Sequence, residues 1–427
     1  MTQQTRIKVD QVVFRKDLYP RFNHDAATIQ RYAESIEFLP AIEVNQNYEL
    51  IDGFHRWTAH KKAGVVDIEA KITKTASDGE LLGLAIERNA THGLQLSMED
   101  KKSMARKLYA SKAYDKKALK VLLKVSTSSL AHWLSDLDKA EREERKKLIL
   151  DMWLGCYTAE EIAESISYSV QPVKDAIDEL SDFSASLQKN PKVTFSDFDE
   201  DDGLRPIYNV WTFSKKTNEV SHFGNSEQRI VDNLLYLYTD PFDIVVDPFA
   251  GGGSTIDVCK KRMRRYWVSD RKPIVERENQ IRKLDIAQEL PALNKRWSDV
   301  TLTYLDPPYW RQAQNKYSKD KEDLANMPLE EFTAALSGVV KRISEKQSKG
   351  VIALIIQPTQ WNAEERQFAD HVTDLIKAVG NKRLTLENRV SCPYSTEQCN
   401  PQMVDWAKKN KKLLVLSREL IIWRVNQ

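Results

Sequence analysis

The amino-acid sequence predicts an α/β protein built from several domains. Two apolar runs of strand length, at 244–246 and 301–305, each end at residues that stop a strand. A glycine-rich turn and a helix-like segment follow the first run, and the first hundred residues repeat the strand–turn–helix pattern on a smaller scale. At 427 residues the chain is long enough for two to four domains with cores of their own.

Composition limits the classes of function. The net charge of +2 is close to neutral, so affinity for nucleic acid has to come from local basic patches. Cys156, Cys259, Cys392 and Cys399 form no Cys-x-x-Cys pair, so we expect no metal site and a reducing, cytoplasmic compartment. We expect no membrane contact, since no apolar run approaches the roughly 20 residues that span a bilayer.

Residues 1–98 are predicted to form a small α/β domain. Strands are expected at 42–44 and 49–51, followed by a helix. Gly53 stands at the strand-to-helix turn with Arg56 close behind it, and backbone amides and a guanidinium together suit a phosphate. An ordinary turn with a surface arginine explains the same residues equally well.

Residues 99–182 have a helical pattern with two helix-turn-helix candidates. The first runs from a helix at 118–123 to a second helix at 128–134, and the second candidate begins at the capping box of Thr158 and Glu161. A plain helical bundle is the structural alternative for both.

Charge separates the two candidates. Residues 101–150 carry 14 basic and 6 acidic side chains, a net of +8, whereas the second candidate is acidic. Only the first is therefore suited to phosphates, and Ser128, Ser129 and His132 would face a DNA groove. An acidic linker is predicted at 183–204 and a third domain at 205–427.

The glycine-rich turn is a candidate ligand loop. It reads Asp247, Pro248, Phe249, Ala250, Gly251, Gly252, Gly253, and a helix is expected to begin near Ser254. Glycines let the backbone approach a ligand closely, although three glycines alone are more often a flexible loop. Asp270 ends the next apolar run about 20 residues later, the spacing at which a carboxylate reaches ribose hydroxyls.

The most informative segment is Asp306, Pro307, Pro308, Tyr309, directly after the strand at 301–305. Proline lacks an N–H and fixes φ, so the strand must stop and present a carboxylate, a carbonyl and an aromatic ring at its end. These groups suit a planar base with an exocyclic amine. The carboxylate and carbonyl accept the N–H hydrogens while the ring of Tyr309 stacks on the base.

Together the two loops resemble those of the DNA amino-methyltransferases over residues 205–427. The resemblance implies a Rossmann-like domain that transfers a methyl group from S-adenosylmethionine to adenine N6 or cytosine N4 in double-stranded DNA, with the target base flipped out. It implies that 247–253, Asp270 and Asp285 bind the cofactor. Further matching segments are 222–225, the helix at 226–238 and a last strand region at 413–423. The glycine loop departs from the frequent Gly-Ser-Gly, and no large recognition insert is evident, so Arg311 and Lys316 are predicted to contact DNA.

Asp306 favours adenine, because the adenine enzymes of this family more often carry Asp at the first position of the tetrad and the cytosine-N4 enzymes Ser. Cytosine-C5 methylation needs a cysteine nucleophile. Cys392 precedes a proline, the reverse of that family's Pro-Cys pair, and is predicted to be a structural thiol.

Residues 1–98 resemble the ParB/sulfiredoxin-like N-terminal domains at 18–21, 39–42, 51–56 and 89–94. The resemblance implies a nucleotide or phosphate site that includes Gly53, His55 and Arg56. His92 replaces an arginine of the partition proteins, which argues against tight triphosphate binding. Phe54 replaces the sulfiredoxin cysteine, which excludes that redox activity.

The sequence therefore predicts a site-specific DNA adenine-N6 methyltransferase of a bacterial or phage-infected cell. The alternatives are an N4-cytosine enzyme, a ParB-like DNA-binding regulator with an inactive methyltransferase half, and a methyltransferase of RNA or protein. Both a monomer and an oligomer are compatible with the sequence.

Overall fold

The computed structural model describes residues 3–20, 25–91, 97–182, 187, 189, 207–213, 227–293, 296–311, 313–360, 368–393 and 401–426. The chain divides into two compact units, Met1–Arg145 and Lys146–Gln427. The division falls inside the long helix α6 (Thr127–Leu154), so the helical region predicted at 99–182 is shared between the units. The linker predicted at 183–204 lies almost entirely outside the described residues.

Unit 1 begins with a four-stranded sheet in the order β1-β4-β2-β3, in which β2 and β4 are parallel and the other pairs antiparallel. Its strands are β1 (Gln3–Lys8), β2 (Ile42–Val44), β3 (Leu50–Asp52) and β4 (Asp67–Ile72), and its helices are α1 (Ala26–Ala33), α2 (Phe54–Lys62) and α3 (Asp78–Thr91). The predicted strands and the helix after Gly53 are confirmed.

The rest of unit 1 is helical and has its own core. It contains α4 (Met98–Ala110), α5 (Lys116–Leu123) and the first part of α6. Leu108, Leu119 and Leu134 are fully buried together with Ile86 of α3. The helix–turn–helix pair α5–α6 therefore exists as predicted, although α6 continues for 28 residues, far past the predicted end at 134.

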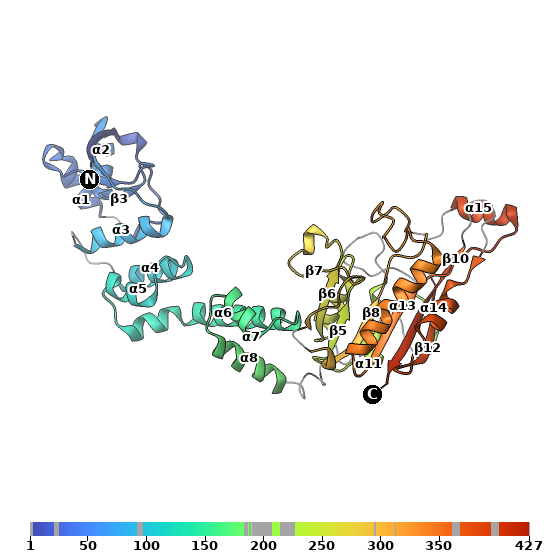
Figure 1. The fold of residues 1–427 in the computed structure, drawn as a ribbon. Coiled ribbons are helices and arrows are strands. Elements are labelled where there is room, and N and C mark those ends of the chain that lie inside the picture. The colour runs from blue at the N-terminus through green and yellow to red at the C-terminus, as the bar shows by residue number, and fades with distance from the viewer. Residues whose placement is uncertain are drawn as a thin grey trace. The chain divides into compact units, whose positions relative to one another are not determined.

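Unit 2 is built on a seven-stranded sheet in the order β12-β13-β9-β8-β5-β6-β7 (Figure 1). Its strands are β5 (Ile244–Asp247), β6 (Arg265–Asp270), β7 (Arg282–Lys283), β8 (Val300–Leu305), β9 (Val351–Ile356), β12 (Leu384–Pro393) and β13 (Ser417–Val425). Within this sheet β13 runs antiparallel to both of its neighbours, and the other pairings are parallel. The Rossmann-like class predicted for this part of the chain is confirmed.

Helices cover both faces of this sheet, which explains why its strands are apolar rather than alternating. The helices of unit 2 are α7 (Ala159–Ser165), α8 (Val170–Asp182), α11 (Gln228–Tyr238), α12 (Ser254–Lys261), α13 (Leu329–Lys346), α14 (His371–Val379) and α15 (Pro401–Asn410). Ala353 of β9 belongs to the core with α11 and α12, and Leu354 belongs to the core with α13 and α14. Two short strands, β10 (Thr359–Gln360) and β11 (Phe368–Ala369), pair beside this layer.

The end of α6, together with α7 and α8, belongs to the core of unit 2. Trp153, Ile162 and Val173 are buried in one cluster with α11 and the sheet. Arg265 of β6 donates from Nε to the Trp153 carbonyl at 3.2 Å, and its guanidinium lies 4.6 Å from the centre of the Trp153 ring. The second helix-turn-helix candidate is thus a structural layer of unit 2, in agreement with the helical-bundle alternative.

The start of the last strand also differs from its prediction. Residues 413–416 were expected to start the last strand region, but β13 begins at Ser417. The predicted segment 222–225 lies outside the described residues.

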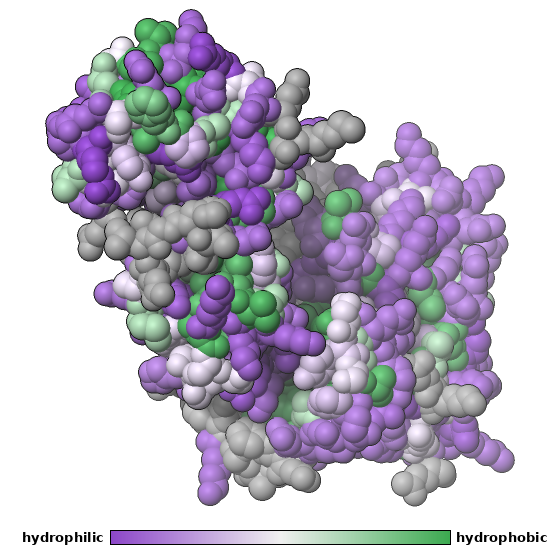
Figure 2. Space-filling view, turned by 90° about the vertical axis from the view of Figure 1, so that its left-hand side faces the viewer, coloured by the Kyte–Doolittle hydropathy of each residue, from purple (hydrophilic) through white to green (hydrophobic). Residues whose placement is uncertain are grey.

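No helix among the described residues is long and apolar enough to cross a membrane. Hydrophilic side chains cover most of the face in Figure 2, with hydrophobic residues in small groups between them.

Candidate active site

The two predicted loops meet at the centre of the sheet of unit 2. β5 and β8 are parallel neighbours, and chain order runs outward from β5 to β6 and β7 on one side and from β8 to β9 on the other. The boundary between β5 and β8 is therefore the point where the strand order reverses. Open α/β sheets bind their ligands beyond the carboxyl ends of the strands at this point. Asp247 ends β5, and Asp306 follows β8 directly.

The glycine loop after β5 needs its glycines. Gly251 and Gly253 have φ of 50° and 80°, in the left-handed region that side chains disfavour. A Cβ added at Gly253 would lie 3.0 Å from the Cδ of Arg277. Arg277 donates from Nη1 to the Gly253 carbonyl at 3.0 Å and to Asp257 Oδ1 of α12 at 2.9 Å. The loop is therefore held against the start of the following helix.

Asp247 shapes this loop from inside the protein. Its Oδ2 accepts a hydrogen bond from the Thr255 hydroxyl at 2.6 Å, and its Oδ1 accepts one from the Phe249 backbone N–H at 2.9 Å. Burial raises the pKa of Asp247 to about 7, with a further upward push from the Asp306 and Asp270 carboxylates. The structure therefore connects Asp247 to the shape of the loop, and direct contact with a cofactor stays a prediction.

Asp270 and Asp285 stand at the ends of the next two strands. Asp270 accepts hydrogen bonds from the backbone N–H groups of Gly251 at 3.0 Å and Lys272 at 2.8 Å. Asp285, just past β7, accepts from the Ala287 N–H at 3.0 Å, with Arg271 Nε 3.6 Å from its other oxygen. Backbone donors thus fix both carboxylates, and Asp270 is fixed against the glycine loop. A left-handed glycine loop with oriented acids at successive strand ends fits a nucleoside-bearing cofactor.

The second loop presents the predicted catalytic residues. Pro307 is buried, whereas Asp306, Pro308 and Tyr309 are half-buried. The hydroxyl of Tyr309 donates to Asp306 Oδ1 at 3.2 Å, and the hydroxyl of Tyr304 donates to Asp306 Oδ2 at 3.4 Å. Sequence reasoning did not single out Tyr304, although its place two residues before Asp306 on the same side of the strand was a usable signal.

The chain from Trp310 to Met327 is fastened near the glycine-loop side of the site. The Trp310 indole donates to the Met327 carbonyl at 2.9 Å, and Arg271 Nη2 lies 3.6 Å from Asp320 Oδ2. Arg311 has a φ of 62°, a conformation that non-glycine residues rarely adopt outside functional or tightly fixed turns. Lys316 is exposed on this loop. The DNA contacts predicted for Arg311 and Lys316 stay predictions.

Arg418 is a second residue that the sequence reasoning missed. It lies near the start of β13, only 4 % exposed, and donates from Nε to the Cys392 carbonyl at 3.3 Å. β13 is antiparallel to β9 and pairs Glu419 with Ile356, so Arg418 lies at the same edge of the sheet as the ends of β8 and β9. An arginine at the head of an apolar strand was its only sequence signal. Cys392 itself is fully buried, and burial raises the pKa of its thiol to about 12, which agrees with the structural thiol predicted there.

The three residues of the predicted phosphate site in unit 1 make contacts within the protein. Arg56 donates from Nη2 to Asp52 at 2.6 Å and from Nη1 to the carbonyls of Pro40 and Ala41 at 3.0 and 2.6 Å. Gly53 has a φ of 104°, and a Cβ there would lie 2.7 Å from Ile42. The ring of His55 accepts a hydrogen bond from the Asp25 N–H at 3.2 Å. These contacts show how the fold holds the three residues, and the nucleotide or phosphate site stays a prediction.

The predicted DNA-reading residues lie at the start of α6. The Ser126 hydroxyl oxygen lies 3.0 Å from that of Ser128 and 2.8 Å from that of Ser129, and it accepts a hydrogen bond from the Ser129 N–H. Ser126 therefore caps the helix, and Ser128 and Ser129 lie in its first turn. His132 is exposed one turn later. Their contact with DNA stays a prediction.

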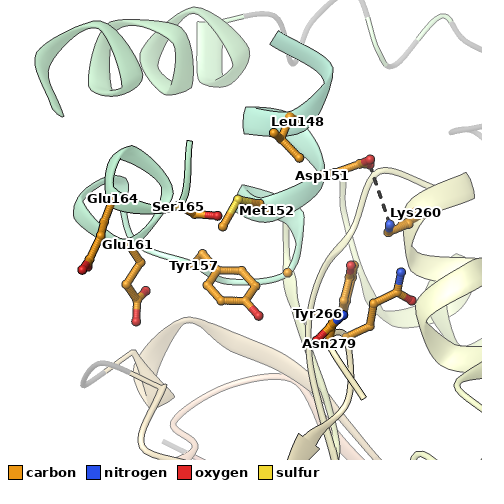
Figure 3. A pocket seen from close by; sticks show the side chains of 12 residues that line it. Leu148, Asp151, Met152, Tyr157, Glu161, Glu164, Ser165, Lys260, Tyr266 and Asn279 are labelled. Carbon is orange, nitrogen blue, oxygen red and sulfur yellow. Dashed lines mark ion pairs between the residues drawn. The ribbon is translucent and has the colours of Figure 1, made fainter. Parts of the chain in front are cut away.

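Unit 2 also has an open pocket of about 530 Å³ away from these loops (Figure 3). The end of α6, α7, α12 and β6 line it, with Tyr157 and Tyr266 among the lining residues and Asp151 paired with Lys260 at 3.8 Å. No residue of the glycine loop or of the segment 306–309 lines this pocket. Within the described residues there is no group of three or more His, Cys, Asp or Glu side chains that could hold a metal ion.

Comparison with known proteins agrees with these motifs. Residues 91–276 match a family model described as DNA methylase, of the N6/N4 methyltransferase type. The match includes the glycine loop and Asp270 and ends before Asp306. The chain is 33 % identical over 64 residues to the type II methyltransferase M.XycI of Xanthomonas campestris pv. cyanopsidis, which covers 15 % of this chain and 21 % of that protein. The chain therefore spans about a fifth of the length of this relative.

Two solved structures each show similarity to part of the chain. One is a C-terminally truncated chromosome-partitioning protein ParB from Caulobacter crescentus complexed with CTP-γ-S, with 17 % identity over 31 % of this chain and 77 % of that chain and a TM-score of 0.20. The other is a putative S-adenosylmethionine dependent methyltransferase from Listeria monocytogenes, with 10 % identity over 44 % of this chain and 91 % of that chain and a TM-score of 0.28.

The family match implies S-adenosylmethionine as the methyl donor, and the glycine loop with its oriented acids fits that cofactor. The resemblance that the motifs indicated is thus confirmed: the chain carries a segment that is similar to the N6/N4 DNA methylase family.

Proposed function

We propose that this protein is a DNA amino-methyltransferase that methylates adenine at N6. The observation that carries the proposal is the meeting of the glycine loop and the Asp306–Tyr309 loop at the point where the strand order reverses. This arrangement supports a cofactor cradle, formed by the glycine loop 247–253 with Asp270 and Asp285, beside Asp306 as the acceptor of the amine. A cytoplasmic location belongs to the same proposal, because the substrate is cellular DNA.

The residues of the Asp306–Tyr309 loop bind and aim the target amine. The amine of a flipped-out base donates its two hydrogens to Asp306 and to the Pro307 carbonyl while Tyr309 stacks on the ring, which offsets part of the few kcal/mol that base extrusion costs. These hydrogen bonds turn the nitrogen lone pair away from ring conjugation. Bound S-adenosylmethionine supplies an electrophilic methyl group on its sulfonium. The chain then contributes chiefly positioning and electrostatics, and the proton leaves the amine after attack.

The proposal is tested by the base that receives the methyl group. Purified full-length protein is incubated with genomic DNA and methyl-tritiated S-adenosylmethionine, and the DNA is digested to nucleosides. We expect tritium in N6-methyladenine. Label in N4-methylcytosine would overturn the adenine assignment and keep the amino-methyltransferase, whereas DNA without label would overturn the whole proposal.

Changes at the cofactor cradle should weaken cofactor binding. Gly251→Val places a side chain on a residue with positive φ, and Asp270→Ala removes the acceptor that orients the Gly251 N–H. We expect at least about a tenfold loss of S-adenosylmethionine affinity in each, since a hydrogen bond to a charged group contributes roughly 1.5–3 kcal/mol. Calorimetric titration measures this, with Asp374→Ala, an exposed carboxylate of α14, as the control. Unchanged S-adenosylmethionine affinity in both variants would contradict the assignment of this loop as the cofactor site.

The basic face of α5 should add DNA affinity through phosphates. Lys117, Lys120 and Lys124 are exposed on and just after this helix. Replacing all three by Ala should lower DNA affinity and reduce the slope of log K against log salt by roughly three, because each phosphate contact contributes about 0.9. The matched control replaces three exposed lysines of unit 2, Lys341, Lys346 and Lys349. Equal slopes for both triple variants would exclude α5 from the DNA contact.

A further inference from the structure

The residue that deepens this account is Tyr304, a buried phenol beneath the Asp306 carboxylate. Tyr304 is the fifth residue of β8 and only 3 % exposed. Its hydroxyl donates to Asp306 Oδ2 at 3.4 Å, from inside the sheet. Buried tyrosine hydroxyls normally have a hydrogen-bond partner, and here the described partner is the residue predicted to receive the amine.

Tyr304 and Tyr309 both contact Asp306, but the fold restricts Tyr304 more than Tyr309. Tyr309 is half-buried on the loop, and its hydroxyl donates to Oδ1 at 3.2 Å. The ring of Tyr309 can therefore adjust when a base stacks on it. Tyr304 is fixed in a strand, so its hydroxyl stays with Oδ2 throughout. A carboxylate accepts up to about four hydrogen bonds, so donors from both tyrosines and from the amine are compatible.

The charges around Asp306 explain why it needs such a donor. Asp247, at the end of β5, is close enough for the Asp306 carboxylate to raise its pKa, and Asp270 acts on Asp247 in the same way. The charge of Arg418 of β13 lowers the pKa of Tyr304. Burial and the neighbouring Asp306 raise the pKa of Tyr304 well above its usual value, so Tyr304 remains a proton donor at every working pH.

We infer that Tyr304 is a positioning residue of the proposed methyl transfer: its hydroxyl holds the Asp306 carboxylate oriented so that Oδ1 receives the amine. This inference rests on the proposed function. Losing the donor leaves Asp306 beside Asp247 with one stabilising hydrogen bond fewer. The pKa of Asp306 then rises, and its rotation about χ2 is less restricted.

The test is Tyr304→Phe, which removes one oxygen and keeps the ring in the core. We expect the single-turnover rate of methyl transfer at neutral pH to fall about tenfold, since hydrogen bonds to charged groups are among the stronger ones. The acidic limb of the pH–rate profile should move upward by about one unit, because the ionised form of Asp306 has lost a donor. S-adenosylmethionine affinity should not change.

The matched control is Tyr266→Phe. Tyr266 is also buried in a strand of this sheet, 4 % exposed, but lies on β6 beside the pocket of Figure 3. It should keep the wild-type rate and pH profile. If Tyr304→Phe keeps both as well while the wild-type protein methylates DNA, the inference is wrong and the proposed function stands. A rate loss without any movement of the acidic limb would reduce Tyr304 to a packing residue. A wild-type protein that methylates no DNA would overturn both.

Discussion

Asp306→Ala should abolish methyl transfer to DNA while S-adenosylmethionine still binds. Asp306 follows β8, and the proposed cofactor cradle lies on the loops after β5, β6 and β7. The variant removes the acceptor of the amine and leaves the hydrogen bonds of Gly251 and Asp270 in place. Removing one preorganised hydrogen-bonding group from an active site typically costs on the order of 10²–10³-fold in rate, and we expect a loss of at least this size.

Tritium incorporation into DNA under single-turnover conditions measures the rate, and calorimetric titration measures cofactor affinity. Asp374→Ala again serves as the control for an exposed acid. Incorporation near the wild-type rate would show that Asp306 is not the amine acceptor. A joint loss of transfer and cofactor binding would instead place Asp306 in the cradle.

Arg262→Ala should cause the largest loss of stability. Arg262 is fully buried at the end of α12, and its Nε and Nη2 donate to Asp232 of α11 at 2.9 and 3.2 Å. Removing the guanidinium leaves the buried Asp232 carboxylate without this partner, which typically costs about 3–5 kcal/mol. Because α12 follows the glycine loop directly, cofactor binding should weaken together with stability.

Urea unfolding followed by tryptophan fluorescence measures the change. The double variant Arg262→Met/Asp232→Leu replaces the pair by apolar side chains and should recover most of the loss. Lys377→Ala breaks the exposed pair with Asp374 and should change stability by less than about 1 kcal/mol. A small effect of Arg262→Ala would mean that Asp232 finds other partners or water.

The sequence predicted the site best where local chemistry determines the structure. Asp247 and Asp306 could be placed because an apolar run and the glycine or proline that stops it are adjacent in the chain. β5 and β8 were found for this reason, and β2 and β6 were found because their apolar runs end at polar residues. Their meeting at one edge then follows from the rules of parallel sheets.

What the sequence did not reveal depends on distant partners. Arg262 and Asp232 are 30 residues apart, and neither looks unusual among charged helix residues. The phosphate hypothesis for Arg56 could not be weighed without the carbonyls of Pro40 and Ala41, which only the fold brings to its guanidinium. The packing of Trp153 and Ile162 against the sheet of unit 2 likewise joins segments that the pattern assigned to different domains.

This packing determines where a fragment that contains unit 2 should begin. A fragment that starts at residue 205 would lose Trp153, Ile162 and Val173 from the core of unit 2. The compact unit begins instead at Lys146. Comparisons of DNA binding therefore use point variants in the full chain rather than the shorter fragment.

The most direct test of the central claim is modification sequencing of single DNA molecules from cells that express the full chain. The account predicts modified adenines at one recurring short sequence, present with the wild-type protein and absent with Asp306→Ala. DNA without any recurring modified base in the wild-type cells, or the same modification in cells with the Asp306→Ala protein, would contradict it.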